Sequence, residues 1–355
     1  MTVRRTRLFA SVAAVAALFA GMSPAAGQVQ LRDAGDWVMP RTADGRPDLQ
    51  GNWTNATLTP LSRPAGQAPV FTREEANGVE ARQERALEEG TAASDPYRPP
   101  PEAGGTNPVC IDSATSCYNE VYRDPGERVA MVNGELRSSL ITFPEDGRVP
   151  TVVPEARERA AAARARTAGF GQYDHPEIRP IAERCLLSFG SNAGPPMLPN
   201  GWYNNNYTIV QTPDHVMIMT EMVHDARVIR IGDGPRLPPD VRPWLGDSWG
   251  RWEGDTLVVE TTNFHPLQQF RGMPSDNLRV IERFTRSDDE TILYEFTIDD
   301  PTTYAEIWGG QVPMQRLDGL VYEYACHEGN YALSNILSGA RYEERLATQG
   351  EAEPR

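Results

Sequence analysis

The segment LRVIERFTRSDDETILYEFTI, residues 278–298, contains two stretches in which apolar and polar side chains largely alternate. Alternation with a period of two is typical of β-strands that bury one face. The polar residues 287–290 between the two stretches form a turn signal. Residues 278–286 and 291–298 therefore predict an antiparallel hairpin.

Further segments of the same kind lie on both sides of this hairpin. They are residues 207–212, 216–222, 227–231, 248–252, 256–262 and 320–326. Turn residues such as Pro213-Asp214 and Glu253-Gly254-Asp255 separate them. About eight short strands without intervening helices predict a mainly β fold, with an antiparallel meander barrel over residues 181–345 and a sandwich as the alternative. Residues 346–355 are expected to form a disordered tail.

Residues 28–180 have a different composition, rich in Pro, Gly, Asp and Arg and poor in apolar side chains. Two helices are predicted there. The first covers residues 72–89, where Thr72 and Glu75 form a capping box, and the second covers residues 154–167, which begin with proline. Because an independent core of this composition would be marginal, we expect an extended arm with one or two helices that wraps the barrel.

The first 27 residues have the three parts of a secretory signal peptide. Arg4, Arg5 and Arg7 precede an apolar run at residues 8–22, and a small-residue cleavage region follows at residues 23–27. No later stretch approaches the roughly 18–20 apolar residues of a membrane helix. We therefore expect a periplasmic or secreted protein without a membrane span.

The formal net charge is −15 and the sequence contains no lysine. An acidic surface disfavours nucleic acid and anionic lipid as partners, but it is compatible with a small-molecule or oligosaccharide ligand. The absence of lysine excludes Schiff-base chemistry. The sequence also lacks a GxSxG elbow, a P-loop and a dinucleotide fingerprint, so an elbow-type serine hydrolase, nucleotide hydrolysis and NAD chemistry have no support. Composition leaves the oligomeric state open.

Four cysteines, Cys110, Cys117, Cys185 and Cys326, follow the signal peptide. An even number in an oxidising compartment favours two disulfides, although sequence does not determine their connectivity. The short spacing suggests a local Cys110–Cys117 bridge, which would leave Cys185 to pair with Cys326. A metal-thiolate site is the alternative, but no CxxC pair supports it.

Several segments carry long and specific motifs. They are RPDLQGNW at residues 46–53, ERC at 183–185, TPDHVMIMTEMVHDARVI at 212–229, GRWEGDTLVVETTNF at 250–264 and YEYACHEGNYAL at 322–333. Together they resemble a large family of exported bacterial proteins, over nearly the whole chain after the leader. The resemblance implies export but no particular reaction. The meander and its Gly-x-Trp signature also resemble lipocalin-type barrels over the C-terminal half.

Glu282 and Glu295 are candidate catalytic carboxylates. If the hairpin turn consists of Asp288-Asp289, the two glutamates lie opposite each other on one face. Like charges so placed are unfavourable unless a cation or a shared proton relieves them, and a shared proton raises one pKa. A protonated and an ionised carboxyl group form the pair that glycosidic cleavage uses. The alternative is that the pair lies on a solvated face or is neutralised by Arg251 or Arg283.

A second candidate group contains Glu221, His224, Asp225 and Arg227, and His327 is a further candidate after Cys326. Histidine is the natural general acid or base near neutral pH. Asp225 can orient the imidazole of His224 only if the backbone turns there, because adjacent strand residues point to opposite faces. Arg227 is a candidate anion stabiliser and His327 a second proton carrier. The alternative is a solvated histidine at a hairpin tip.

Aromatic, amide and cationic side chains supply candidates for substrate binding, since flat rings and amides suit sugar faces and hydroxyls. The candidates are Tyr203, Asn205, Trp249, Arg251, His265 and Arg271. Histidines and carboxylates could hold a divalent ion, but HxH and HExxH spacings are absent, so we predict no metal site and no cofactor.

The sequence thus predicts an exported enzyme that performs cofactor-free acid/base chemistry, as a lyase or hydrolase, on a carbohydrate, glycoside or aromatic compound. Ionisable residues expected on one strand face, Glu260, Glu282 and Glu295, favour catalysis over the apolar lining of a carrier. The alternative is a non-catalytic, lipocalin-like barrel that binds a small molecule.

Overall fold

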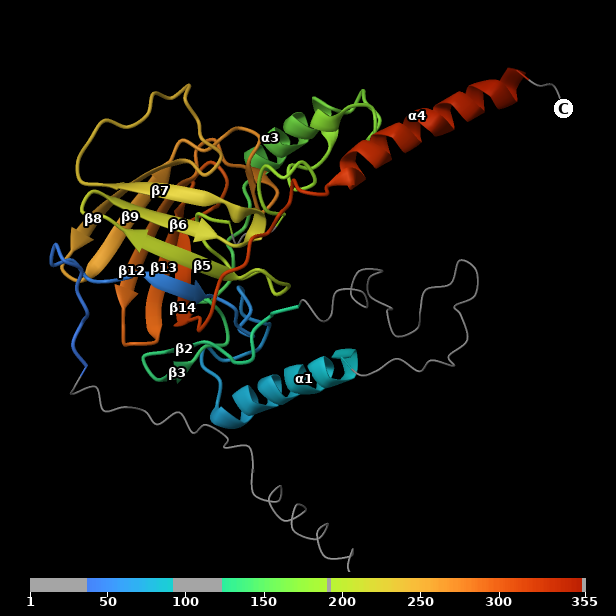
Figure 1. Ribbon diagram of the computed structural model, residues 1–355. Helices are drawn as coiled ribbons and strands as arrows, with labels where there is room; N and C mark the ends of the chain where they lie inside the picture. Colours follow the sequence, from blue (N-terminus) through green and yellow to red (C-terminus); the bar gives the residue numbers. More distant parts are fainter. Residues whose placement is uncertain (1–36, 92–122, 190–192, 353–355) are drawn as a thin grey trace, which may run out of the picture. The chain divides into compact units, whose positions relative to one another are not determined.

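The computed structural model describes residues 37–91, 123–189 and 193–352 (Figure 1). The architecture that follows is that of the unit Met39–Arg355. The predicted signal peptide and the predicted Cys110–Cys117 bridge lie outside the described residues.

A closed barrel of nine strands dominates the described part of the chain (Figure 1). In barrel order the strands are β1 (Gly51–Thr54), β5 (Asn206–Gln211), β6 (His215–Thr220), β7 (Ala226–Ile231), β8 (Asp247–Glu253), β9 (Thr256–Thr262), β12 (Arg279–Arg286), β13 (Thr291–Asp299) and β14 (Trp308–Arg316). Strand β14 pairs back onto β1 and, near its start, also with β4 (Ile141–Phe143). The predicted mainly β barrel is confirmed, and two of its pairing strands, β1 and β4, come from the Pro- and Gly-rich region.

The barrel is mixed rather than purely antiparallel as predicted, because β7 and β8 run parallel. Parallel neighbours need a connection that returns to the other end of the sheet, and a tight turn cannot provide it. Residues 232–246, which contain Pro238-Pro239, make this return. Periodicity predicts strands but not their direction when the connection is this long.

The hairpin of β12 and β13 forms in a register that differs from the predicted one. Glu282 lies opposite Phe296, and Glu295 lies opposite Arg283. The Ser287 N–H donates to the Thr291 carbonyl, so residues 288–290 form a three-residue loop instead of the two-residue turn assumed from sequence. A shift of one residue moves a side chain to the other face of the sheet. Glu282 therefore faces the barrel interior while Glu295 faces outward, and the predicted carboxylate pair does not exist.

The last barrel strand, β14, was not predicted, and the strand predicted over residues 320–326 does not form. Strand β14 contains two glycines and a proline, which normally argue against a strand. Here the glycines allow two backbones to approach. A Cβ atom would lie 2.1 Å from the Phe296 carbonyl oxygen at Gly309 and 2.1 Å from that of Leu140 at Gly310.

Both predicted helices are confirmed. Helix α1 (Arg73–Thr91) begins after Thr72, whose hydroxyl accepts from the Glu75 N–H while the Glu75 carboxylate accepts from the Thr72 N–H. Helix α3 (Pro154–Ala165) starts at its proline. Helix α4 (Tyr331–Ala352) occupies part of the stretch that was expected to be a disordered tail. The described helices do not combine the length and the apolar character needed to cross a membrane.

The described part of the chain also contains short elements: β2 (Met131–Val132), β3 (Glu135–Leu136), β10 (Gln269–Phe270), β11 (Met273–Pro274) and the 3-10 helices η3 (Pro176–Ile178) and η4 (Met222–His224).

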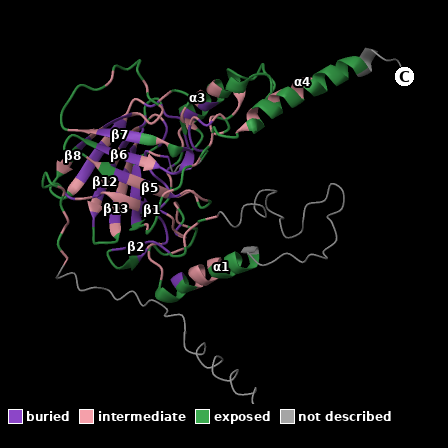
Figure 2. Ribbon diagram, viewed as in Figure 1, coloured by how far each residue is buried: buried purple, intermediate pink, exposed green. Residues whose placement is uncertain are grey.

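The barrel interior is filled by one buried cluster of side chains. Its largest members, each less than 2% exposed, include Trp53, Tyr207, Phe284, Tyr294 and Trp308. Buried residues recur along the barrel strands, whereas α4 is mostly exposed (Figure 2). The interior is therefore a packed core, whereas the barrel of a lipocalin-type carrier encloses a cavity for its ligand.

Candidate functional site

Arg227 and Glu282 form an ion pair inside the barrel. Arg227 donates through both terminal nitrogens, with 2.9 Å between Nη2 and Oε1, and the Tyr294 hydroxyl donates to the same oxygen at 3.0 Å. The two charged side chains are only 4% and 0% exposed. Burial alone would lower the pKa of Arg227, but the carboxylate of Glu282 outweighs burial, and the pKa is raised. The pair is satisfied internally and joins β7 to β12 across the core.

The rim of the barrel between β6 and β7 contains a strained turn. The 3-10 helix η4 has left-handed backbone at Val223 (φ 62°) and His224 (φ 48°). Residues with a β-branched side chain rarely adopt this conformation, which costs about 1–3 kcal/mol and often marks a functional site. The Thr220 N–H donates to the Asp225 carbonyl at 2.7 Å and closes the turn. The turn that the sequence required at His224 and Asp225 is thus present.

The imidazole of His224 is oriented by a backbone carbonyl. Its Nδ1 lies 2.9 Å from the backbone carbonyl oxygen of Tyr324. A carbonyl only accepts hydrogen bonds, so Nδ1 carries a proton, and in the neutral form of the ring the lone pair is at Nε2. The side chain is exposed, and the ring of His327 lies 6.4 Å away between centroids. Two imidazoles therefore stand together at the rim, one of them in the tautomer of a general base.

Carboxyl groups with raised pKa values surround this turn. Burial raises the pKa of Asp225 to about 7, against the opposing effects of His224 and the Ser188 backbone. Its Oδ2 is enclosed and has no hydrogen-bond partner among the described residues. Burial also raises the pKa values of Glu221 and Asp124. A carboxyl group with a pKa near 7, as in Asp225, is suited to acid/base catalysis near neutral pH.

The predicted disulfide between Cys185 and Cys326 lies beside the strained turn. It joins residues 141 positions apart, with 5.7 Å between the Cα atoms. Met222 and Val223 pack against Cys185. Tyr324, whose carbonyl orients His224, comes shortly before Cys326. The bridge therefore fixes both the strained turn and the acceptor that selects the tautomer of His224.

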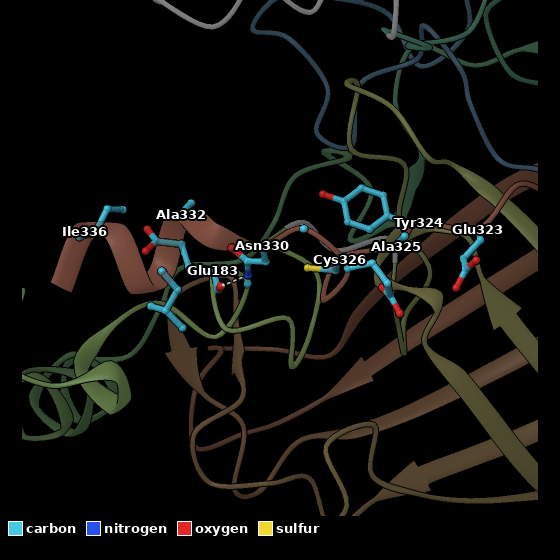
Figure 3. Close-up of a pocket in the computed structure, with 12 residues that line it drawn as sticks. Glu183, Glu323, Tyr324, Ala325, Cys326, Asn330, Ala332 and Ile336 are labelled. Atoms are coloured by element: carbon cyan, nitrogen blue, oxygen red, sulfur yellow. Dashed lines mark hydrogen bonds between the residues drawn. The ribbon is translucent and has the colours of Figure 1, made fainter. Parts of the chain in front are cut away.

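A cavity of about 570 Å³ adjoins the disulfide (Figure 3). It is lined by Ala182, Glu183, Glu323, Tyr324, Ala325, Cys326, Glu328, Gly329, Asn330, Ala332, Leu333 and Ile336. Tyr324 is part of the lining of this cavity, and its backbone carbonyl oxygen accepts the hydrogen bond from His224. The cavity and the imidazole are thus neighbours, although His224 does not itself line the cavity.

The predicted substrate-binding residues do not converge on one site. Tyr203 packs at the rim beside Cys185 and Met222. Asn205 is fully buried and donates to the Asp124 carbonyl at 3.0 Å, so its role is to hold the chain in place.

The remaining candidates lie elsewhere on the barrel. Trp249 and Arg251 line a separate cavity of about 150 Å³ together with Glu260. His265 stacks on Trp244 with 3.8 Å between ring centroids. Arg271 is exposed and has left-handed backbone.

On the outer face of the barrel, the Glu295 carboxylate accepts a hydrogen bond from Gln311 at 2.9 Å, and Glu260 forms an ion pair with Arg279. Glu260, Glu282 and Glu295 therefore do not share one face as expected, because only Glu282 is turned inward.

Sequence reasoning missed Tyr324 and the acidic lining of the large cavity. The signal that could have found them is the YEYACHEGNYAL segment around Cys326, because a disulfide there brings its neighbours to the Cys185 side of the chain. Within the described ranges, groups of three or more His, Cys, Asp or Glu placed to hold a metal ion do not occur.

Asp225→Asn is expected to remove a loss of stability that the wild-type protein suffers as pH rises from about 4 to about 7. The unfolded carboxyl ionises near pH 4, whereas the folded one has a pKa of about 7. Between these values the folded state holds more protons, so ionisation favours unfolding by at most about 1.4 kcal/mol per pH unit, and by less because water reaches part of the carboxyl. Urea unfolding of both proteins across this range measures the effect, and a constant stability difference would contradict it.

A scan of the chain against models of protein families gives no match, and no curated protein matches it.

Proposed function

We propose that the protein is an exported enzyme that performs acid/base chemistry on a small molecule at the rim of the barrel. The observation that carries the proposal is the exposed imidazole of His224, whose Nδ1 is held by the Tyr324 carbonyl and whose Nε2 is left open. It stands on a strained turn next to Asp225, a carboxyl group whose pKa is raised to about 7. Such strain and such a pKa together are typical of catalytic sites.

The two side chains have complementary roles in the proposed reaction. His224 takes a proton from the substrate, or from a water molecule that attacks it, through Nε2. Asp225 or His327 gives a proton to the leaving oxygen, so that no net charge accumulates, and exchange with solvent restores both groups. Elimination and hydrolysis use the same two proton transfers, and either a lyase or a hydrolase fits. Arg227 and Glu282 are excluded from this scheme because their charges satisfy each other inside the core.

An exported location fits the Cys185–Cys326 disulfide, because such bridges persist in oxidising compartments such as the periplasm and the extracellular space. The substrate classes that we propose are carbohydrates, glycosides and aromatic compounds, which suit the aromatic side chains of Tyr203 and Tyr324 at the rim. No cofactor enters the proposed proton transfers.

The second candidate function is ligand binding without reaction. The packed barrel interior argues against a ligand in the lumen, but the external cavity of about 570 Å³ has an apolar part and a size typical of small-molecule sites.

The test is mass-spectrometric profiling of pooled oligosaccharides, glycosides and aromatic compounds incubated with the protein. We expect one compound to be converted to a product, and His224→Ala to lower its rate by on the order of 100-fold or more. His215→Ala is the matched control, because His215 is also a surface histidine beside an aspartate, Asp214, but lies at the other end of β6. A parallel sample with chelator reports a metal requirement.

Conversion that survives His224→Ala would remove the proposed base. Compounds that stay bound and unchanged would favour the second candidate function.

A further inference from the structure

The cavity beside the disulfide is lined by acidic and apolar groups, with no cationic side chain among the described residues that form its wall. Its volume of about 570 Å³ is within the range of sites for small organic ligands. Figure 3 shows residues of helix α4, including Ala332 and Ile336, on one side and Glu323 and Tyr324, from the segment before the helix, on the other.

The acidic lining carries charge that the described structure does not neutralise. Glu183 is paired with Arg179, with 2.7 Å between Nη2 and Oε2. Glu323 and Glu328 are exposed, and neither forms an ion pair within the described parts of the chain. Two carboxylates therefore face the cavity and its mouth without a counter-charge. The net charge of −15 adds a long-range attraction for cations.

The apolar lining supplies a surface for a hydrocarbon or aromatic body. Leu333 and Ile336 are one helical turn apart on α4, and Ala182 and Ala325 add small apolar groups. Tyr324 provides an aromatic ring, and aromatic rings attract cations over their faces. A neutral ligand would leave the carboxylates unpaired, and an anion would be repelled by them.

We infer that this cavity binds organic ammonium compounds, which combine a protonated or quaternary nitrogen with an apolar body. The nitrogen lies near Glu323, Glu328 and the ring of Tyr324, while the body packs on Leu333 and Ile336. The inference rests on the proposed function in one respect: the bound cation is taken to be the anchored part of the substrate. Tyr324 then lies between this cation and His224. Binding itself does not require turnover.

Isothermal titration of the protein with benzyltrimethylammonium, benzyl alcohol and benzoate tests the inference. These probes share an aromatic ring and differ in charge. We expect the cation to bind about tenfold more tightly than the neutral alcohol, and benzoate to bind most weakly. Added salt should weaken binding of the cation and leave binding of the alcohol nearly unchanged.

Variants assign this preference to the cavity. The double variant Glu323→Gln with Glu328→Gln should abolish the roughly tenfold difference between cation and alcohol. Glu306→Gln is the matched control, because Glu306 is an exposed glutamate between β13 and β14 that does not line the cavity. Ile336→Arg places a cation on the exposed helix α4 and should block the ammonium probe without disturbing the barrel core.

Equal affinity for the cation and the alcohol would overturn the inference, as would equal losses in Glu306→Gln and in the double variant. Unchanged binding of the cation by Ile336→Arg would also overturn it. Binding of the ammonium probe by His224→Ala should match that of the wild-type protein. Cation binding without any turnover would therefore keep the inference and remove the proposed enzyme, whereas turnover of neutral compounds without cation binding would do the reverse.

Discussion

Replacing Glu282 by alanine is expected to lower the free energy of unfolding by about 3–5 kcal/mol. The substitution leaves the guanidinium of Arg227, which is 4% exposed, without its carboxylate in the packed interior. It also removes the acceptor of the Tyr294 hydroxyl. An uncompensated buried charge costs much more than the ion pair contributes, because the charge has lost its hydration. Urea unfolding followed by far-UV circular dichroism measures the loss.

Two further variants separate this cause from a general effect of mutation. Arg227→Met combined with Glu282→Leu removes both charges, so most of the lost stability should return. Glu253→Ala breaks a pair with Arg283 in which each side chain is 40% exposed, and it should change stability much less because water solvates the remaining charge. A loss in Glu282→Ala no larger than that in Glu253→Ala would show that the buried pair is not a major determinant of stability.

The strands of the barrel were predictable where the chain alternates over six or more residues, as in β12 and β13. The register between them was not, because it depends on the loop. The Asp288 carboxylate accepts from the Glu290 N–H at 2.8 Å and favours a three-residue loop. Four polar residues in a row do not distinguish this loop from a two-residue turn. That single difference turned Glu282 away from Glu295.

Strands β1 and β4 contain four and three residues, which is too short for a period of two to be recognised. Strand β14 was hidden for a different reason. Glycine normally weakens a strand, but here Gly309 and Gly310 are required because the backbones of β13 and of the segment at β4 approach closely. The segment at β4 lies far away in the sequence, so the local pattern does not reveal this need.

The side chains of the candidate site could be predicted from the sequence, but their hydrogen-bond and ion-pair partners could not. His224, Asp225 and His327 could be chosen by residue type, and the turn at His224 followed from the need to bring it to Asp225. The acceptor of His224 is a backbone carbonyl 100 residues later, and any residue could supply it. Arg227 and Glu282 were each recognised as charged groups, but their pairing depends on the order of the strands around the barrel.

Removing the disulfide through Cys185→Ala and Cys326→Ala is expected to lower the free energy of unfolding by about 2–5 kcal/mol, towards the upper end because the bridge spans 141 residues. The cross-link restricts the unfolded chain, and longer loops lose more conformational freedom. The same double variant should release the Tyr324 carbonyl from its fixed position beside His224. The rate of the proposed reaction should then fall at temperatures where the barrel is still folded.

The two effects are measured on the same samples, with unfolding followed by tryptophan fluorescence and activity assayed well below the transition. Cys110→Ala with Cys117→Ala is the matched control, since a bridge between these residues would close a much shorter loop and its removal should cost less stability. A stable but inactive Cys185/Cys326 variant would mean that the bridge acts mainly by positioning the rim. A less stable variant with full activity would mean that His224 keeps its orientation without the bridge, and Tyr324 would no longer be needed as its acceptor.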